Sequence, residues 1–127
     1  MSVFNTARLD AARSFSTGKF TDAATTLADH VEFHIYEEAK HIKGKAGVLR
    51  FCEGIAAYFN TVDTRFEERG TVCDDSHVVI YGYATFRRDG RLLSSVHSCD
   101  VYSFDTNGKI EKIQSYCNSQ RAAHTQQ

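Results

Sequence analysis

Apolar and polar positions alternate most clearly over residues 92–117, where two strand-like runs flank an Asn-Gly pair at 107–108. An Asn-Gly pair accepts positive φ at little cost, so this pattern predicts a β-hairpin. Because side chains alternate between the two faces of a strand, Asp100 shares its face with apolar and aromatic neighbours. The residues of that face are Val96, Ser98, Asp100, Tyr102 and Phe104. The opposite face carries Cys99 and Val101, so neither face is plainly the one that meets water.

Helical spacing of apolar residues indicates three helices before this hairpin. Residues 5–16 and 20–27 carry apolar side chains three or four positions apart and predict a helical hairpin. The pattern over residues 45–62 predicts the longest helix. Its apolar stripe is broad, as is typical of a helix that packs across a sheet. The apolar stripe of this long helix is Val48, Cys52, Ile55 and Phe59.

Strand-like alternation also appears outside the hairpin. Over residues 31–36, Glu32, His34 and Tyr36 fall on the face opposite to Val31, Phe33 and Ile35. Residues 65–73 and 77–86 predict two more strands, and the charged stretch 37–44 predicts an exposed loop. Helices come early and most strands late, an order that favours an α+β fold with a largely antiparallel sheet and helices on one face.

Composition narrows the classes of function. The 127 residues are 42% hydrophobic and 24% charged with a formal net charge of −1, which suits one globular domain over residues 1–127 with a core at about 5–118 and a polar C-terminal tail. The sequence has no basic stripe of the kind that binds nucleic acid, and no apolar run long enough to span a membrane. The charged N-terminal stretch is unlike a secretory signal. Four cysteines and six histidines without paired spacing predict free thiols, a cytoplasmic location, and neither metal nor cofactor.

Asp100 is the most informative candidate residue, and it has two interpretations. Strand aspartates usually face water or pair with a lysine or arginine. A carboxylate turned inward among apolar neighbours is instead a candidate functional group, because burial perturbs its protonation.

Several short motifs follow one another in a characteristic order. They are STGKF at 16–20, LADHV at 27–31, GKAGV at 44–48, DVYSFD at 100–105 followed by GKI at 108–110, and QSY at 114–116. With the predicted order of elements, they resemble the nuclear transport factor 2-like superfamily. The resemblance covers roughly residues 7–118 and is closest to the ketosteroid isomerase-like and SnoaL-like (polyketide cyclase) branches.

This resemblance implies a curved sheet that wraps the long helix into a cone with an apolar pocket. It matches Asp100 with the pocket aspartate of ketosteroid isomerases, a carboxylic acid kept neutral so that it can donate a hydrogen bond. The catalytic base of those enzymes falls on Ile35, which cannot accept a proton, and a slip of one residue would place His34 there. Their pocket tyrosines fall on Ala11 and near Cys52, so steroid isomerisation is not expected.

Asp100 and His34 are therefore the candidate catalytic residues. Candidate ligand-binding residues are Tyr36, Tyr58, Ser98, Tyr102, Ile113, Ser115 and Cys117. Each of these residues also has a purely structural interpretation. His34 can lie on the outer face of the sheet, the tyrosines can serve only in packing, and Cys117 can be an inert thiol of the core. The nine phenylalanines and six tyrosines can also fill a cone completely.

Two classes of function remain open. One is a cofactor-free cyclase or isomerase that acts on a hydrophobic carbonyl compound, with Asp100 as acid–base group or oxyanion donor. The other is a non-catalytic ligand-binding or dimerisation module of the same fold. A cavity of roughly 300 Å³ or more with Asp100 in its wall favours the first class, and a filled cone favours the second. We expect a small hydrophobic ligand and a homodimer formed through the apolar outer face of the sheet.

Overall fold

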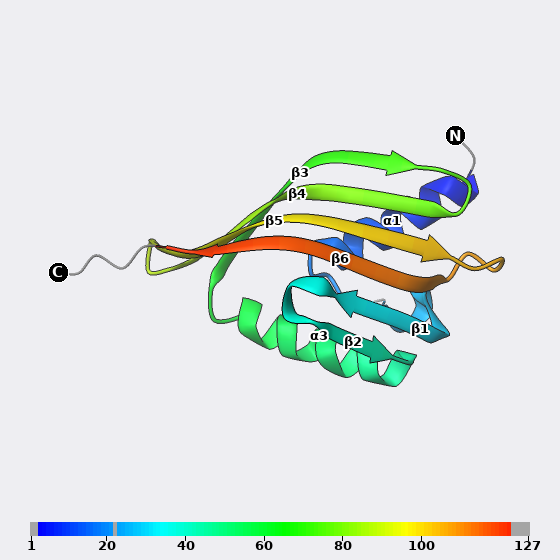
Figure 1. Ribbon diagram of the computed structural model, residues 1–127, viewed down its shortest axis with the longest axis horizontal. Helices are drawn as coiled ribbons and strands as arrows, with labels where there is room; N and C mark the ends of the chain where they lie inside the picture. Colours follow the sequence, from blue (N-terminus) through cyan, green and yellow to red (C-terminus); the bar gives the residue numbers. More distant parts are fainter. Residues whose placement is uncertain (1–2, 22, 123–127) are drawn as a thin grey trace.

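One curved, unclosed sheet of six strands organises the protein, in the order β2-β1-β6-β5-β4-β3 (Figure 1). The computed structural model describes residues 3–21 and 23–122. The helices are α1 (Val3–Ser16), α2 (Ala23–Thr26) and α3 (Lys45–Phe59). The strands are β1 (Leu27–Ile35), β2 (Lys40–Lys43), β3 (Asp63–Cys73), β4 (His77–Arg88), β5 (Arg91–Phe104) and β6 (Ile110–Arg121). Among the strands of the described residues only β1 and β6 pair in parallel, so the predicted α+β fold with a mostly antiparallel sheet is confirmed.

The hairpin predicted over residues 92–117 is confirmed as β5 and β6. Its turn is held by Asp105, whose carboxylate accepts hydrogen bonds from the backbone N–H groups of Asn107 and Lys109, each at 2.9 Å. The strand register places Asp100 opposite Ser115. Both side chains therefore lie on the same face of the sheet, two positions along from a fully buried pair formed by Tyr102 and Ile113.

Element boundaries differ from the prediction around β1. The helix expected over residues 20–27 is wrong in extent, because α2 has only four residues and Leu27 already begins the strand. Leu27 is 1% exposed and pairs in parallel with Ile110 of β6, a long-range contact that outweighs local helical spacing. The expected loop at 37–44 contains the edge strand β2, and β6 continues through the tail that was expected from Asn118.

The helices cover one face of the sheet. Helix α1 packs against β4 and β5, while α3 lies along β1 and β2 (Figure 1). The guanidinium of Arg13 on α1 makes two hydrogen bonds to the carboxylate of Glu68 on β3, at 2.9 and 3.0 Å. Between these layers lies an aromatic core in which Phe15 contacts the rings of Phe33 and Tyr102. None of the described helices is long and apolar enough to cross a membrane.

Candidate functional site

The Asp100 carboxylate lies where the end of α1 meets β5 and β6. Ser115 Oγ donates a hydrogen bond to Asp100 Oδ1 at 2.8 Å, and Ser16 Oγ donates one to Asp100 Oδ2 at 3.0 Å. Ser16 Oγ also lies 2.5 Å from the Tyr102 hydroxyl. Both carboxylate oxygens are therefore hydrogen-bonded, and three hydroxyl groups form a continuous network with the acid.

Ser16 reaches this network because of the way α1 ends. Gly18 adopts φ +81°, and the N–H groups of Gly18 and Lys19 bond the carbonyls of Phe15 and Ser14 at 3.1 and 2.8 Å. This is a Schellman motif, in which a left-handed residue, usually glycine, terminates a helix. The motif stops α1 directly after Ser16, whose side chain then faces the sheet.

Burial controls the protonation of the two acidic groups in the network. Burial raises the pKa of Asp100, and the hydrogen bonds from Ser115 and Ser16, which stabilise the ionised form, offset this only in part. Burial likewise raises the pKa of Tyr102 well above its ordinary value, and the nearby Asp100 adds to this effect. The site therefore favours a neutral carboxylic acid more than water does, beside a phenol that stays protonated.

An apolar cavity of about 120 Å³ opens beside the carboxylate. The residues that line it are Phe15, Ser16, Gly18, Phe20, Phe33, Ile55, Phe59, Asp100, Tyr102, Ile113 and Ser115. For comparison, an engineered apolar cavity of roughly 150 Å³ in another protein accepts benzene. Among these described lining residues Asp100 is the only carboxylate, and no histidine, lysine or cysteine is present.

Phe59 closes part of the cavity wall against the backbone of Gly18. A Cβ atom added to Gly18 would lie 2.6 Å from Cε2 of the Phe59 ring. Phe59 also stacks on Phe86, with ring centroids 5.9 Å apart. The C-terminal end of α3 thus contributes one aromatic ring to the cavity wall, packed so closely on Gly18 that a side chain at this position would require the ring to move.

The fold and this site agree with the family to which the sequence can be assigned. The model of the SnoaL-like domain matches residues 9–113 of the chain. The protein belongs to the SnoaL-like family. A search of curated proteins finds no match. Solved structures place the family within the nuclear transport factor 2-like superfamily, as the sequence motifs predict.

Three solved structures illustrate the range of relatives. An NTF2-like protein of unknown function from Cytophaga hutchinsonii has a TM-score of 0.76 and 27% identity, with 89% of this chain and 97% of that chain covered. A putative SnoaL-like polyketide cyclase from Shewanella denitrificans has a TM-score of 0.72 and 11% identity, with coverage of 93% and 92%. An epoxide hydrolase/cyclase-like enzyme with a role in pyran ring formation in the polyether salinomycin has a TM-score of 0.69 and 12% identity, with coverage of 93% and 98%.

Several predicted site residues of this SnoaL-like protein do lie together. Tyr102, Ile113 and Ser115 line the cavity with Asp100. Cys117 lies next along β6, with its Sγ 3.3 Å from Ser115 Oγ, but it does not line the cavity. Ser98, which pairs with Cys117, borders a separate, open depression with it.

The structure does not bring the other three candidates to Asp100. His34 and Tyr36 lie on the outer face, where Tyr36 is 45% exposed and its hydroxyl accepts a hydrogen bond from Gln114. Tyr58 lies on α3, is 44% exposed and contacts the rings of Phe59 and Phe86. The pairing of His34 with Asp100 is therefore wrong, because strand alternation places these two side chains on opposite faces.

The register at β1 settles which residue faces inward. Ile35 is 7% exposed and pairs with Ser115, whereas His34 pairs with Gln114. Ile35, not His34, is therefore the residue of β1 on the same face of the sheet as Ser115 and Asp100. On the outer face, burial and the neighbouring His41 lower the pKa of His34.

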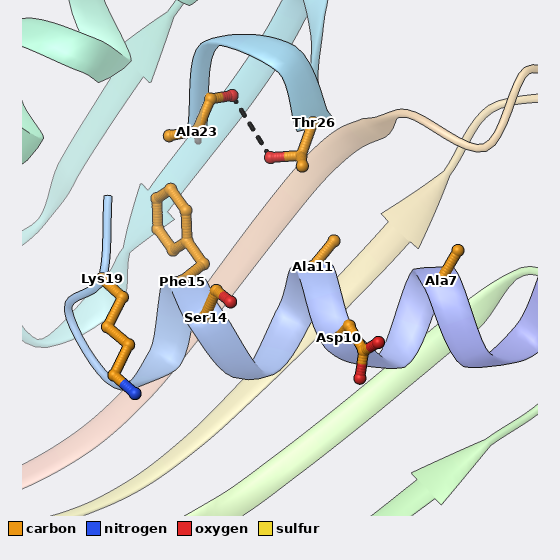
Figure 2. Close-up of a pocket in the computed structure, with 8 residues that line it drawn as sticks. All are labelled: Ala7, Asp10, Ala11, Ser14, Phe15, Lys19, Ala23 and Thr26. Carbon is orange, nitrogen blue, oxygen red and sulfur yellow. Dashed lines mark hydrogen bonds between the residues drawn. The ribbon is translucent and has the colours of Figure 1, made fainter. Parts of the chain in front are cut away.

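A larger hollow of about 320 Å³ lies elsewhere, between α1 and the segment around α2. Figure 2 shows its lining, with Ala7, Ala11 and Phe15 in one row along α1 and Ala23 and Thr26 beyond them. Thr26 Oγ1 bonds the carbonyl of Ala23 at 3.2 Å. Asp100 is not part of this hollow, so its size does not bear on the carboxylate site.

The sequence did not indicate Ser16 or the apolar residues of the cavity wall. Phe15, Phe33 and Phe59 have the spacing of ordinary core residues, and Phe15 and Phe33 do belong to the core. The one sequence feature that could have drawn attention to Ser16 was its position two residues before Gly18, where the first helix was expected to end.

Proposed function

We propose that this SnoaL-like protein binds a small, mainly apolar carbonyl compound in the cavity beside Asp100 and acts on it as a cofactor-free isomerase or cyclase. The observation that carries the proposal is a single carboxyl group, with its pKa raised by burial, in the wall of a mainly apolar cavity. Sites with this combination of apolar walls and one perturbed acid commonly bind small molecules.

Asp100 can serve such chemistry in two ways. As a neutral acid, it donates a hydrogen bond to the carbonyl oxygen of the ligand, and that bond strengthens as the oxygen gains negative charge in an enolate. As an ionised group, it accepts a proton from the carbon next to the carbonyl. The raised pKa favours the donor role, while Ser16 and Ser115 hold the carboxyl group in a fixed orientation.

The related structures support the class of reaction. A putative polyketide cyclase and an epoxide hydrolase/cyclase-like enzyme share the fold over most of their length. Their identities of 11% and 12% make this a likeness of fold, so the reaction rests on the Asp100 site itself.

Steroid isomerisation is not part of the proposal. Ile35 faces inward where a base would be required, and loss of a positioned base typically costs about 10²–10⁴-fold in rate. A cavity of about 120 Å³ also has no room for a steroid nucleus.

Cyclohexanone, a monocyclic ketone about the size of benzene, is a suitable probe. Binding is measured as a shift in Tm, and enolisation as deuterium uptake next to the carbonyl in D₂O. We expect the wild type to do both, and Asp100→Ala to lose both. Asp100→Asn should keep part of the binding if Asp100 is a donor and lose exchange entirely if it is a base. The exposed Asp63 supplies the control, since Asp63→Asn should behave as the wild type does.

Two observations favour a non-catalytic ligand-binding or dimerisation module as the second candidate. The cavity is smaller than the roughly 300 Å³ of typical ligand sites. In addition, both oxygens of Asp100 already have partners within the protein. Probe binding without deuterium exchange in the wild type would support a non-catalytic ligand-binding module over the enzyme, and absence of both would support a dimerisation module.

A further inference from the structure

Three metal-ligating side chains come together on the outer face of the sheet, at the edge formed by β1 and β2. Antiparallel pairing places His34 of β1 directly opposite His41 of β2, and Glu32 lies two residues before His34 on the same face. One ligand atom from each residue lies within 4.8 Å of the other two. The sequence spacing gave no metal motif, because the pairing of the strands creates the cluster.

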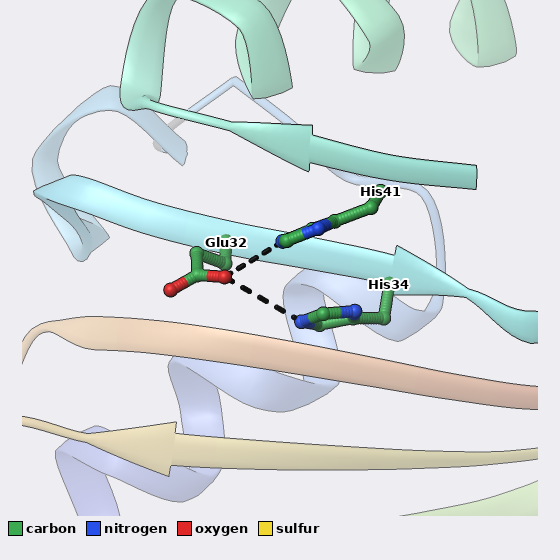
Figure 3. Close-up of side chains that lie close together, drawn as sticks. All are labelled: Glu32, His34 and His41. Carbon is green, nitrogen blue, oxygen red and sulfur yellow. Dashed lines mark hydrogen bonds and ion pairs between the residues drawn. The ribbon is translucent and has the colours of Figure 1, made fainter.

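The two imidazole rings converge on one carboxylate oxygen. His41 Nε2 lies 2.6 Å from Glu32 Oε1, and His34 Nε2 lies 3.6 Å from the same atom. Figure 3 shows both rings side by side with these nitrogens directed toward Glu32, and their centroids are 3.9 Å apart. Tyr36 stacks on His34 at 5.6 Å and limits the orientations of that ring.

We propose that Glu32, His34 and His41 bind one divalent transition-metal ion of the zinc type. Two imidazole nitrogens and one carboxylate oxygen form a ligand set that Zn²⁺ uses with water in the fourth position. Mg²⁺ and Ca²⁺ prefer sites made entirely of oxygen ligands, so the two histidines select against them.

Binding requires a small rearrangement that this edge of the sheet allows. Zinc lies roughly 2.0–2.2 Å from nitrogen and oxygen ligands, so the ion takes the place of the hydrogen bond between His41 and Glu32. The side chains of His41 and Glu32 are 38% and 39% exposed, which leaves them room to turn toward an ion, while His34, 20% exposed and stacked on Tyr36, stays in place. Lys43 and Lys112 lie near His34 and oppose a cation, so a moderate affinity is expected.

The bound ion would join the short edge strand β2 to β1. Strand β2 has four residues, and three of them are exposed. A metal that bridges His41 to Glu32 and His34 should therefore stabilise this edge. The site lies on the face opposite Asp100, so it is independent of the function proposed above.

Calorimetric titration of the reduced protein with ZnCl₂ tests the site. We expect one ion per chain for the wild type, no binding of MgCl₂, and an affinity for zinc at least about 10-fold weaker in His41→Ala and in Glu32→Gln. His30→Ala is the matched control. His30 also lies 3.6 Å from a glutamate, Glu111, but it has no second histidine beside it, so this variant should bind zinc as the wild type does.

Two further measurements separate the outcomes. Circular dichroism without metal shows whether each variant is folded, and Glu32→Gln preserves side-chain shape if His41→Ala is unstable. Co²⁺ should give visible bands without the strong thiolate charge-transfer absorption that ligation by the exposed Cys73 would produce. No zinc binding by the wild type would overturn the proposal. Equal binding by folded His41→Ala, or a thiolate spectrum, would also overturn it.

Discussion

Ser16 and Asp100 lie 84 residues apart in the chain, yet Ser16 Oγ donates a hydrogen bond to Asp100 Oδ2 at 3.0 Å. This contact joins the end of α1 to the middle of the sheet and depends on the helix stopping at Gly18. Because the acid is also buried, its protonation is coupled to the formation of the native structure. The coupling can be measured without knowledge of any ligand.

The stability difference between wild type and Asp100→Asn should depend on pH. The pKa of Asp100 is higher in the folded than in the unfolded chain, so the folded state holds the proton more tightly. Its contribution to stability is then complete below the ordinary carboxyl pKa of about 3.9 and is lost as pH rises through the folded pKa. The loss amounts to about 1.4 kcal/mol for each pH unit that separates the folded from the unfolded pKa. Urea unfolding of both proteins over a pH series measures this loss, since other titrating groups cancel in the difference. The free energy of unfolding of the wild type minus that of Asp100→Asn should fall as pH rises. A value that stays constant or rises with pH would contradict the prediction.

The fold was largely predictable because its signals are local. Alternation around the Asn-Gly pair was enough to predict the hairpin and the face that carries Asp100. The extent of β1 was not predictable, because the parallel pairing of Leu27 with Ile110 joins distant segments. The same reason explains why Ser16 was missed and His34 was misassigned. Proximity to Asp100 depends on how α1 docks and on a strand register that local patterns leave uncertain by one residue.

Gly18→Ala should destabilise the protein more than Gly90→Ala does. Both glycines have positive φ, +81° and +78°, so alanine is strained at either position. At Gly18 the new Cβ would also collide with the Phe59 ring, whereas no heavy atom lies within 4 Å at Gly90. We expect at least about 1 kcal/mol beyond the loss at Gly90, which urea unfolding measures directly. Equal losses would show that Phe59 moves away at no cost.

Thiol reactivity should divide the four cysteines by burial. The structure holds all four as free thiols, with Cys73 exposed and Cys52 buried. Burial raises the pKa of Cys52 to about 12, so this thiol should stay unreactive toward a disulfide reagent until the protein unfolds. Cys73 should react first, and Cys73→Ser should remove that fast phase while Cys52→Ser leaves it intact. Titration of the denatured, unreduced protein with the same reagent should give four thiols per chain, and a count of two or fewer would refute the prediction.

The protein should form a homodimer through the outer face of the sheet. The described helices pack on the inner face, and the outer face leaves Tyr81 and Tyr116 exposed to 44% and 48%. Apolar surface of this kind on an antiparallel sheet is a common site of association. Light scattering at micromolar concentration should give twice the chain mass of 14.3 kDa.

A lysine in the interface would be buried without a partner, so Tyr116→Lys should shift the mass toward the monomer. Tyr58→Lys changes a tyrosine of similar exposure on α3, away from this face, and should leave the dimer intact. A wild-type mass equal to that of one chain, or dissociation by Tyr58→Lys alone, would exclude this interface.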